Sequence, residues 1–131
     1  MFVEVSRTLT EIVRFTNRHR IDAEFHLHTV GQLQGETEVP DPYWAKFEKY
    51  PGVYLIFDVS QSAVRYIGMS ERDTGSRLYR WLFKENKVND VLQSGDIVLS
   101  VVLREQFYMA PALESYLIQK LRPVLNVRGA V

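Results

Sequence analysis

Two short segments in the middle of the chain each join a glycine and a tyrosine within an apolar, strand-like run. The first is residues 52–54, glycine, valine and tyrosine, and the second is residues 66–68, tyrosine, isoleucine and glycine. Only residues 58–64 lie between the two runs, which is about the length of a hairpin connection. Adjacent strands of this kind can direct the Tyr54 and Tyr66 hydroxyls to one place, so this pair constrains both the fold and the chemistry.

The composition is that of a single globular domain. The chain has 131 residues, of which 46% are hydrophobic and 24% charged. It has no cysteine, which excludes disulfides, thiolate metal sites and a cysteine nucleophile. No apolar run approaches the roughly 18 residues of a membrane span, and the N-terminus lacks the layout of a signal peptide. We therefore expect a cytoplasmic protein with no membrane partner.

Positive charge is concentrated in one region, although 16 basic and 16 acidic residues give a net charge of zero. Between residues 65 and 87 the basic residues outnumber the acidic ones. The basic ones are Arg65, Arg72, Arg77, Arg80, Lys84 and Lys87, and the acidic ones are Glu71, Asp73 and Glu85. Charge clustered in this way attracts a polyanion even on a neutral protein.

From residue 43 onward the pattern predicts a compact core. Apolar runs rich in β-branched and aromatic residues predict strands at 52–58, 63–70 and 97–103. The last strand is almost continuously apolar, which is typical of a central strand covered on both faces. Helices are expected at 77–84, 88–93 and 111–121.

Residues 1–42 form an added segment before this core. A capping-box pattern predicts a helix at 8–18. Residues 22–28 alternate between apolar and polar side chains, which is typical of a half-buried strand. Residues 31–42 have the glycine and proline content of a loop.

The helix at 77–84 places Arg77, Arg80 and Lys84 on one stripe. A solvated charged face is the simpler interpretation, and the helical pattern alone favours it. Arg77 also stands near the helix start and close in sequence to Tyr66. A planar guanidinium at that place can bind a phosphate through two hydrogen bonds, so both interpretations stay open.

Glu114 lies on the apolar stripe of the helix at 111–121. The residues at its neighbouring helical positions are Ala110, Leu117, Ile118 and Leu121. Burying an ionised carboxylate among them is costly unless the charge has a partner. That partner is an arginine at the edge of the core, a hydroxyl or a hard cation. One carboxylate is a sufficient protein ligand for Mg²⁺, which keeps most of its waters.

The remaining residues are weak signals when each is taken alone. Tyrosines in strands usually pack, and with a pKa of about 10 a tyrosine is a poor base. Asn126 is first interpreted as a turn or edge asparagine, and the alternative is that its side-chain amide fixes a tyrosine or a catalytic loop. Glu24, His26 and His28 share one face of the strand at 22–28, where solvated side chains and a transition-metal site are the alternatives.

Taken in order, five features resemble the GIY-YIG nuclease superfamily: residues 52–54, residues 66–68, Arg77, Glu114 and Asn126. The resemblance covers about residues 50–127. It implies an α+β fold with a small three-stranded antiparallel sheet flanked by helices, to which residues 1–42 add a helix and a strand. It also implies metal-dependent hydrolysis of DNA phosphodiesters that leaves 3′-hydroxyl and 5′-phosphate ends.

The resemblance implies a role for each residue. Tyr54 is expected to act as general base or to orient the attacking water, and Tyr66 to support it and contact the phosphate. Arg77 is expected to bind the scissile phosphate, and Asn126 to brace the site. Glu114 is expected to hold one Mg²⁺, for which Mn²⁺ substitutes. One cation and one arginine supply the charge compensation that attack on an anionic phosphodiester needs.

One position departs from the family pattern. Many members have a histidine or tyrosine one helical turn after the arginine. Here that position is Trp81, which cannot transfer a proton. The mechanism implied by the resemblance therefore depends more heavily on Tyr54.

DNA is the expected partner. Six basic residues are expected to contact it outside the active site: Arg14, Arg18, Arg65, Arg80, Lys84 and Lys87. The segment 1–42 is expected to bind DNA or a partner subunit, and a homodimer or larger homo-oligomer suits a small neutral nuclease. The alternatives are a non-catalytic nucleic-acid-binding module on the same fold, and an interaction domain in which the site residues only pack or form ion pairs.

Overall fold

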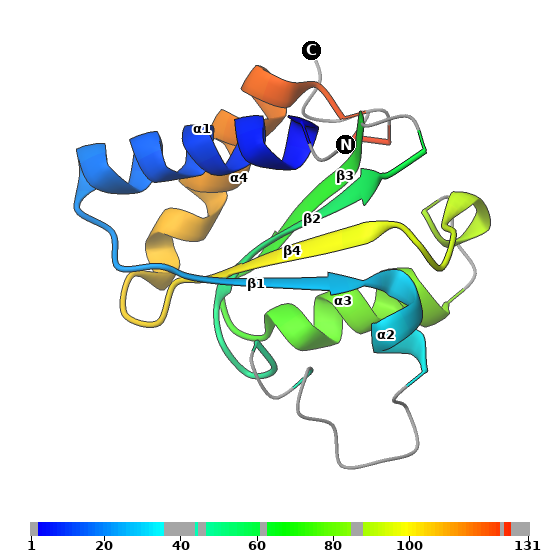
Figure 1. Cartoon of the computed structure of the whole chain (residues 1–131). Helices are drawn as coiled ribbons and strands as arrows, with labels where there is room; N and C mark the ends of the chain where they lie inside the picture. Colours follow the sequence, from blue (N-terminus) through cyan, green and yellow to red (C-terminus); the bar gives the residue numbers. More distant parts are fainter. Residues whose placement is uncertain are drawn as a thin grey trace.

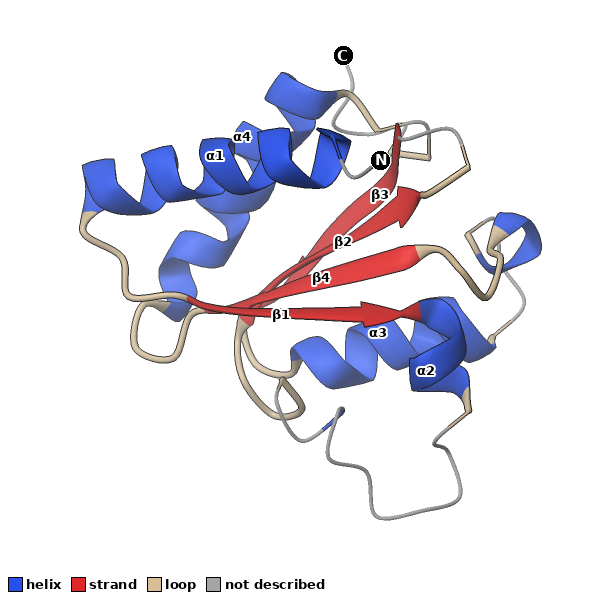
Figure 2. Cartoon of the chain, in the orientation of Figure 1, coloured by secondary structure: helices blue, strands red, loops and turns tan. Residues whose placement is uncertain are grey.

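A four-stranded antiparallel sheet forms the centre of the described residues, which in this computed structural model are 3–35, 44, 47–60, 63–84, 88–123 and 125–126. The strand order across the sheet is β1-β4-β2-β3 (Figure 1 and Figure 2). The strands are β1 (Glu24–Thr29), β2 (Gly52–Asp58), β3 (Ala63–Ser70) and β4 (Ile97–Val102). The two strands with tyrosine motifs, β2 and β3, are therefore neighbours, and β3 forms one outer edge.

Helices cover both faces of this sheet (Figure 1). On one face lie α1 (Val3–His19) and α4 (Ala110–Leu121), and on the other lie α2 (Val30–Gln34) and α3 (Thr74–Phe83). Two short 3-10 helices, η2 (Asn89–Val91) and η3 (Phe107–Met109), precede β4 and α4. None of the helices in the described ranges has the length and hydrophobicity that crossing a membrane requires.

The pleat of β2 divides the core into two layers. Every residue of β2 is buried. Val53, Leu55 and Phe57 pack into the layer that contains the inner faces of α1 and α4. Tyr54 and Ile56 point the other way, into the layer that contains α2 and α3. The period of two in a strand thus places Tyr54 on the α3 face of the sheet.

The sheet has four strands where the sequence analysis expected three. The additional strand is β1, which pairs antiparallel with β4 from Glu24 opposite Val102 to Thr29 opposite Ile97. β4 is therefore paired on both sides, with β1 along one edge and β2 along the other, and its side chains are almost all buried. The central position expected for the strand at 97–103 is confirmed.

In β1 the apolar side chains are exposed and the polar ones are half-buried, which is the opposite of what the alternating sequence pattern indicates. Phe25 and Leu27 are 39% and 51% exposed, whereas His26 and His28 are half-buried. The reason is the cover that each face receives. On the Phe25 face, α4 packs against β2 and β3 and α1 packs against α4. On the other face, His28 lies beside the ring of Phe47.

Two helices start where short side chains cap them. α3 begins at Thr74 rather than at residue 77, because the Asp73 carboxylate accepts a hydrogen bond of 2.9 Å from the Ser76 N–H. α2 occupies residues that the sequence analysis assigned to a loop. Its start is a capping box in which Thr29 and Gln32 bond each other's backbone N–H.

The division of the chain at residue 42 stays a prediction. The described part of segment 1–42 contributes β1 to the sheet, and its helix α1 packs against α4.

Replacing Gly52 with alanine is expected to destabilise the sheet, because a Cβ there would overlap the carbonyl oxygen of Val101 on β4. Overpacking of this kind costs about 1–3 kcal/mol. Gly95 is the matched control, since a Cβ at that position meets nothing within 4 Å. Urea unfolding of the two variants should show a large loss of unfolding free energy for Gly52→Ala and little change for Gly95→Ala. Equal losses would contradict this account of the motif glycine.

Candidate active site

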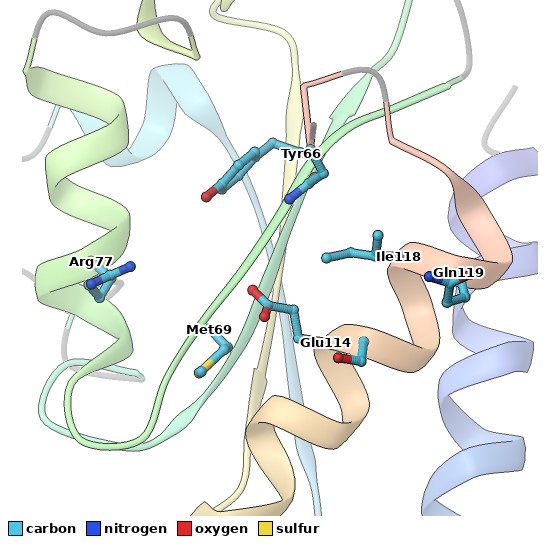
Figure 3. Close-up of a pocket in the computed structure, with 8 residues that line it drawn as sticks. Tyr66, Met69, Arg77, Glu114, Ile118 and Gln119 are labelled. Atoms are coloured by element: carbon cyan, nitrogen blue, oxygen red, sulfur yellow. The ribbon is translucent and has the colours of Figure 1, made fainter. Parts of the chain in front are cut away.

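A pocket of about 450 Å³ lies along the outer edge of the sheet beside β3. It is lined by Tyr66 and Met69 of β3, by Arg77 of α3, by Glu114, Ser115, Ile118 and Gln119 of α4, and by Asn126. Figure 3 shows α3 and α4 on either side of the strand, with the Glu114 carboxylate directed toward the strand between them. Because no described strand pairs beyond β3, helices from opposite faces of the sheet border one space.

Tyr54 lies behind this pocket and does not line it. Its side chain has no exposed surface. Tyr54 stands opposite Gly68 in the β2–β3 ladder, and a Cβ at position 68 would overlap the Tyr54 ring and hydroxyl. The glycine of the second motif is therefore what allows the tyrosine of the first motif to lie flat across β3.

Trp81 connects Tyr54 to Tyr66. Its indole N–H donates a hydrogen bond of 2.6 Å to the Tyr54 hydroxyl oxygen. Its ring centroid lies 4.9 Å from that of Tyr66, and the two tyrosine rings are 6.2 Å apart. An indole can only donate, so the Tyr54 oxygen is the acceptor and the Tyr54 hydrogen is left to bond elsewhere.

Both tyrosine hydroxyls are protonated at neutral pH. Burial raises the pKa of Tyr54 well above its ordinary value and the nearby Tyr66 raises it further, while the charge of Arg77 and the Trp81 bond act in the opposite direction. The pKa of Tyr66 is also raised, by burial and then by the negative charge of Glu114, again against Arg77. A tyrosine with a pKa of about 10 is already less than about one part in a thousand phenolate at pH 7.

Arg77 and Glu114 flank Tyr66 with opposite charges. Arg77 is exposed in the first turns of α3. Glu114 is half-buried on α4, where Ala110, Leu117 and Ile118 around it are buried as the sequence pattern indicates. The described residues contain no group of three or more histidine, aspartate, glutamate or cysteine side chains that could hold a metal ion. A cation in this pocket would therefore have Glu114 as its carboxylate and water for much of its shell, which suits Mg²⁺.

Asn126 pairs with β3 as a short extra strand would. Its side-chain amide donates to the Ile67 carbonyl oxygen and accepts from the Ile67 N–H, both at 2.7 Å. The Leu125 N–H adds a bond of 2.8 Å to the Arg65 carbonyl oxygen. These bonds fix the backbone of β3 between Tyr66 and Gly68, where both motif residues need a defined position.

Arg65 does not reach the pocket. Its guanidinium lies 3.0 Å from the Asp96 carboxylate and 3.3 Å from that of Asp58, and both aspartates are buried. Its side chain is 15% exposed. Arg65 thus compensates two buried carboxylates, and its expected contact with DNA stays a prediction.

The other basic residues predicted to contact DNA lie on two helices. Arg80 is exposed on α3, one turn beyond Arg77, and Lys84 is exposed at its C-terminal end. Arg14 and Arg18 are exposed on α1, where Arg14 lies 3.4 Å from Glu11. Lys87 falls outside the described residues. The alternative metal site at Glu24, His26 and His28 lies on β1, at the opposite edge of the sheet from the pocket.

The contacts of Trp81 with the two tyrosines were not predicted from the sequence. The sequence showed only that Trp81 departs from the family pattern. Its i+4 spacing from Arg77 was the available signal, because that spacing puts both side chains on the face of α3 that meets the tyrosines. Met69, Ser115 and Gln119 also line the pocket without having been singled out. No sequence pattern distinguishes them from ordinary surface residues.

The bond between Trp81 and Tyr54 can be measured with a double-mutant cycle. Trp81→Phe and Tyr54→Phe each remove one partner, and a coupling of about 0.5–1.5 kcal/mol in unfolding free energy is expected. Tyr79→Phe combined with Trp81→Phe is the control, since Tyr79 is exposed on the same helix. Additive effects in the Tyr54 cycle would show that the bond contributes nothing to stability.

Stability is expected to fall at high pH because of the buried tyrosines. Their pKa values are raised in the folded state, so their contribution is complete below the unfolded value of about 10 and is lost as pH rises above it. Unfolding free energies measured from pH 8 to about pH 11 should decline less in Tyr54→Phe than in the parent. An identical decline in both proteins would contradict the raised pKa of Tyr54.

Comparison with known proteins gives one distant structural likeness. No protein-family model matches the chain, and no curated protein is similar to it in sequence. Among solved structures, the fold is similar to that of the GIY-YIG N-terminal endonuclease domain of UvrC from Thermotoga maritima, a point mutant bound to the catalytic divalent cation. The two chains are 23% identical, and the likeness covers 67% of this chain and 99% of that chain with a TM-score of 0.49.

Proposed function

We propose that this protein is a metal-dependent DNA endonuclease of the GIY-YIG type. The observation that supports this most directly is the pocket beside β3. Tyr66, Arg77, Glu114 and Asn126 come from four separate segments and line that one space. A guanidinium, a carboxylate and a tyrosine hydroxyl around one space are the groups that charge compensation at a phosphate uses.

Arg77 and Glu114 are proposed to compensate charge during phosphodiester hydrolysis. The exposed guanidinium of Arg77 would bind the scissile phosphate through paired hydrogen bonds. Glu114 would hold Mg²⁺, with Mn²⁺ as a substitute, and the ion would stabilise the leaving 3′ oxygen. Cleavage on that side of the phosphorus leaves 3′-hydroxyl and 5′-phosphate ends.

The tyrosines are proposed to orient the attacking water, whose proton would pass to bulk solvent rather than to either phenol. An efficient general base has a pKa near the working pH, and the pKa values of both tyrosines are shifted away from it. Tyr66 lines the pocket and is placed to contact water and phosphate. Tyr54, which is fully buried, would act through Tyr66 and the backbone of β3.

DNA is proposed to lie across the outer side of α3. Arg80 and Lys84 extend the positive charge of Arg77 along this helix. Lys87, which falls outside the described residues, stays a predicted DNA contact. Arg14 and Arg18 on α1 are proposed as contacts outside the active site, within the segment 1–42 that is proposed to bind DNA or a partner subunit. Their side chains are exposed, as such a role requires.

A non-catalytic nucleic-acid-binding module on the same fold is the second candidate. Trp81 favours it, because an indole stands where many family members have a side chain that transfers protons. The buried position of Tyr54 agrees with this alternative too, since no water can contact a hydroxyl with no exposed surface.

Nicking of supercoiled plasmid separates the two functions. Cleavage is expected with Mg²⁺ or Mn²⁺ and none with EDTA. Glu114→Gln keeps the side-chain shape and Arg77→Ala removes the guanidinium, and each should slow nicking by about 10²–10³-fold. Glu71→Gln and Arg72→Ala are controls, because both residues are exposed and neither lines the pocket.

DNA binding is measured in parallel by fluorescence anisotropy, with EDTA present. Binding without nicking in the parent protein would favour the non-catalytic module. Neither binding nor nicking would leave an interaction domain as the remaining interpretation. Equal nicking by Glu114→Gln and Glu71→Gln would remove Glu114 from the proposed metal site.

A further inference from the structure

β1 is an edge strand without the features that usually prevent pairing. Among the described strands it pairs with β4 only. Natural edge strands carry lysine, proline or a bulge that discourages a further strand from adding. The six residues Glu24–Thr29 contain no lysine or proline, and their pairing with β4 runs without a register shift.

Apolar side chains are exposed on the same strand. Phe25 and Leu27 are 39% and 51% exposed although both belong to a sheet strand. They lie on the face that α1 and α4 cover elsewhere (Figure 1), and the main contacts of α4 with the sheet are to β2 and β3. Exposed apolar residues beside open backbone groups are the features of a strand-pairing surface.

We propose that β1 pairs antiparallel with β1 of a second copy of this chain, about a twofold axis at His26. This register places Phe25 opposite the partner's Leu27 on one face of the sheet. On the other face it places Glu24 opposite the partner's His28. Each of these contacts occurs twice, whereas His26 lies opposite the same residue of the second copy once, on the axis.

The strand is complementary to itself in charge and in shape. Glu24 is anchored by a two-pronged contact with Arg104, so its carboxylate is held at a fixed place on the strand. The partner's His28 would face this anchored carboxylate, from which His26 of the same strand lies 3.6 Å away. The apolar pair on the other face would bury the two side chains that the monomer leaves exposed.

A strand pairing shifted to an axis at the next residue leaves more side chains of β1 without a partner. An axis at Leu27 would put Phe25 opposite Thr29 and leave Glu24 with no residue opposite it on the strand. Thr29 is already committed to capping α2, because its N–H donates to the Gln32 side chain at 2.8 Å. The axis at His26 avoids Thr29 altogether.

The dimer would be one continuous eight-stranded sheet. Since β1 and β3 are the two outer strands of the monomer, joining at β1 leaves both copies of β3 at the far edges. The two pockets would therefore stay open on opposite sides of the assembly. The inference does not depend on the proposed function, because it concerns the other edge of the sheet.

Single cysteines test the register, and the chain suits them because it has no native cysteine. Under mild oxidation a disulfide should link His26→Cys to its own copy efficiently and Leu27→Cys poorly, because only directly opposite positions bring the two Cβ atoms close enough. Phe25→Cys mixed with Leu27→Cys should give the mixed dimer in preference to either self-linked product. Cross-linking of Leu27→Cys but not His26→Cys would overturn the proposed axis.

Sedimentation equilibrium tests the association itself, at concentrations up to about 1 mM because one strand pair buries a small area. Leu27→Lys should weaken dimerisation by about tenfold or more, since the axis brings the substitution into the interface twice. Val91→Lys is the control, because Val91 is 40% exposed and lies outside β1. A monomeric parent protein, or equal weakening by both variants, would overturn the proposal. Circular dichroism confirms that each variant is folded.

Discussion

The outer position of β3 in the sheet is the constraint on which the candidate site depends. An inner strand is covered by neighbours on both sides, whereas beyond an edge strand the helices of opposite faces can approach each other. Arg77 on α3 and Glu114 on α4 use this opening to face one pocket. An open edge also needs its backbone groups satisfied, and the Asn126 amide does so at Ile67 without closing the space beside Tyr66.

The electrostatics of the pocket favour charge compensation over strong base catalysis. A cationic and an anionic side chain act on Tyr66 from different elements, and their effects on its pKa oppose each other. Burial is the largest influence on both tyrosine pKa values, and because it raises them, both tyrosines are neutral. In the proposed reaction, catalysis therefore comes from preorganised positive charge, with the hydroxyls holding water in place. Trp81 fits that arrangement, because a group that only donates can position Tyr54 without exchanging protons.

The sequence predicted the parts of the fold that local pattern controls. The strands at 52–58 and 63–70 have the expected bounds, because their apolar runs are bounded by turn residues on both sides. The face of β1 was not predictable, since the exposure of Phe25 and Leu27 depends on how far α4 extends over the sheet. For the site, the family resemblance predicted that Tyr66, Arg77, Glu114 and Asn126 lie together, and all four line the pocket. Their roles stay predictions. Arg65 shows what a local sequence pattern cannot predict. Its ion-pair partner Asp96 is 31 residues away in the sequence, and no local pattern reveals such a pair.

The contact between Tyr54 and Gly68 has a consequence for how the two motifs can change over time. The ring occupies the space where any other side chain at position 68 would begin. The two halves of the motif are therefore one packing unit, although thirteen residues separate them in the sequence. A smaller side chain at 54 would release the constraint on 68, whereas a larger one at 68 would expel the ring and break its bond to Trp81. Substitutions at these two positions should thus be inherited as pairs, which makes their joint presence more informative than either residue alone.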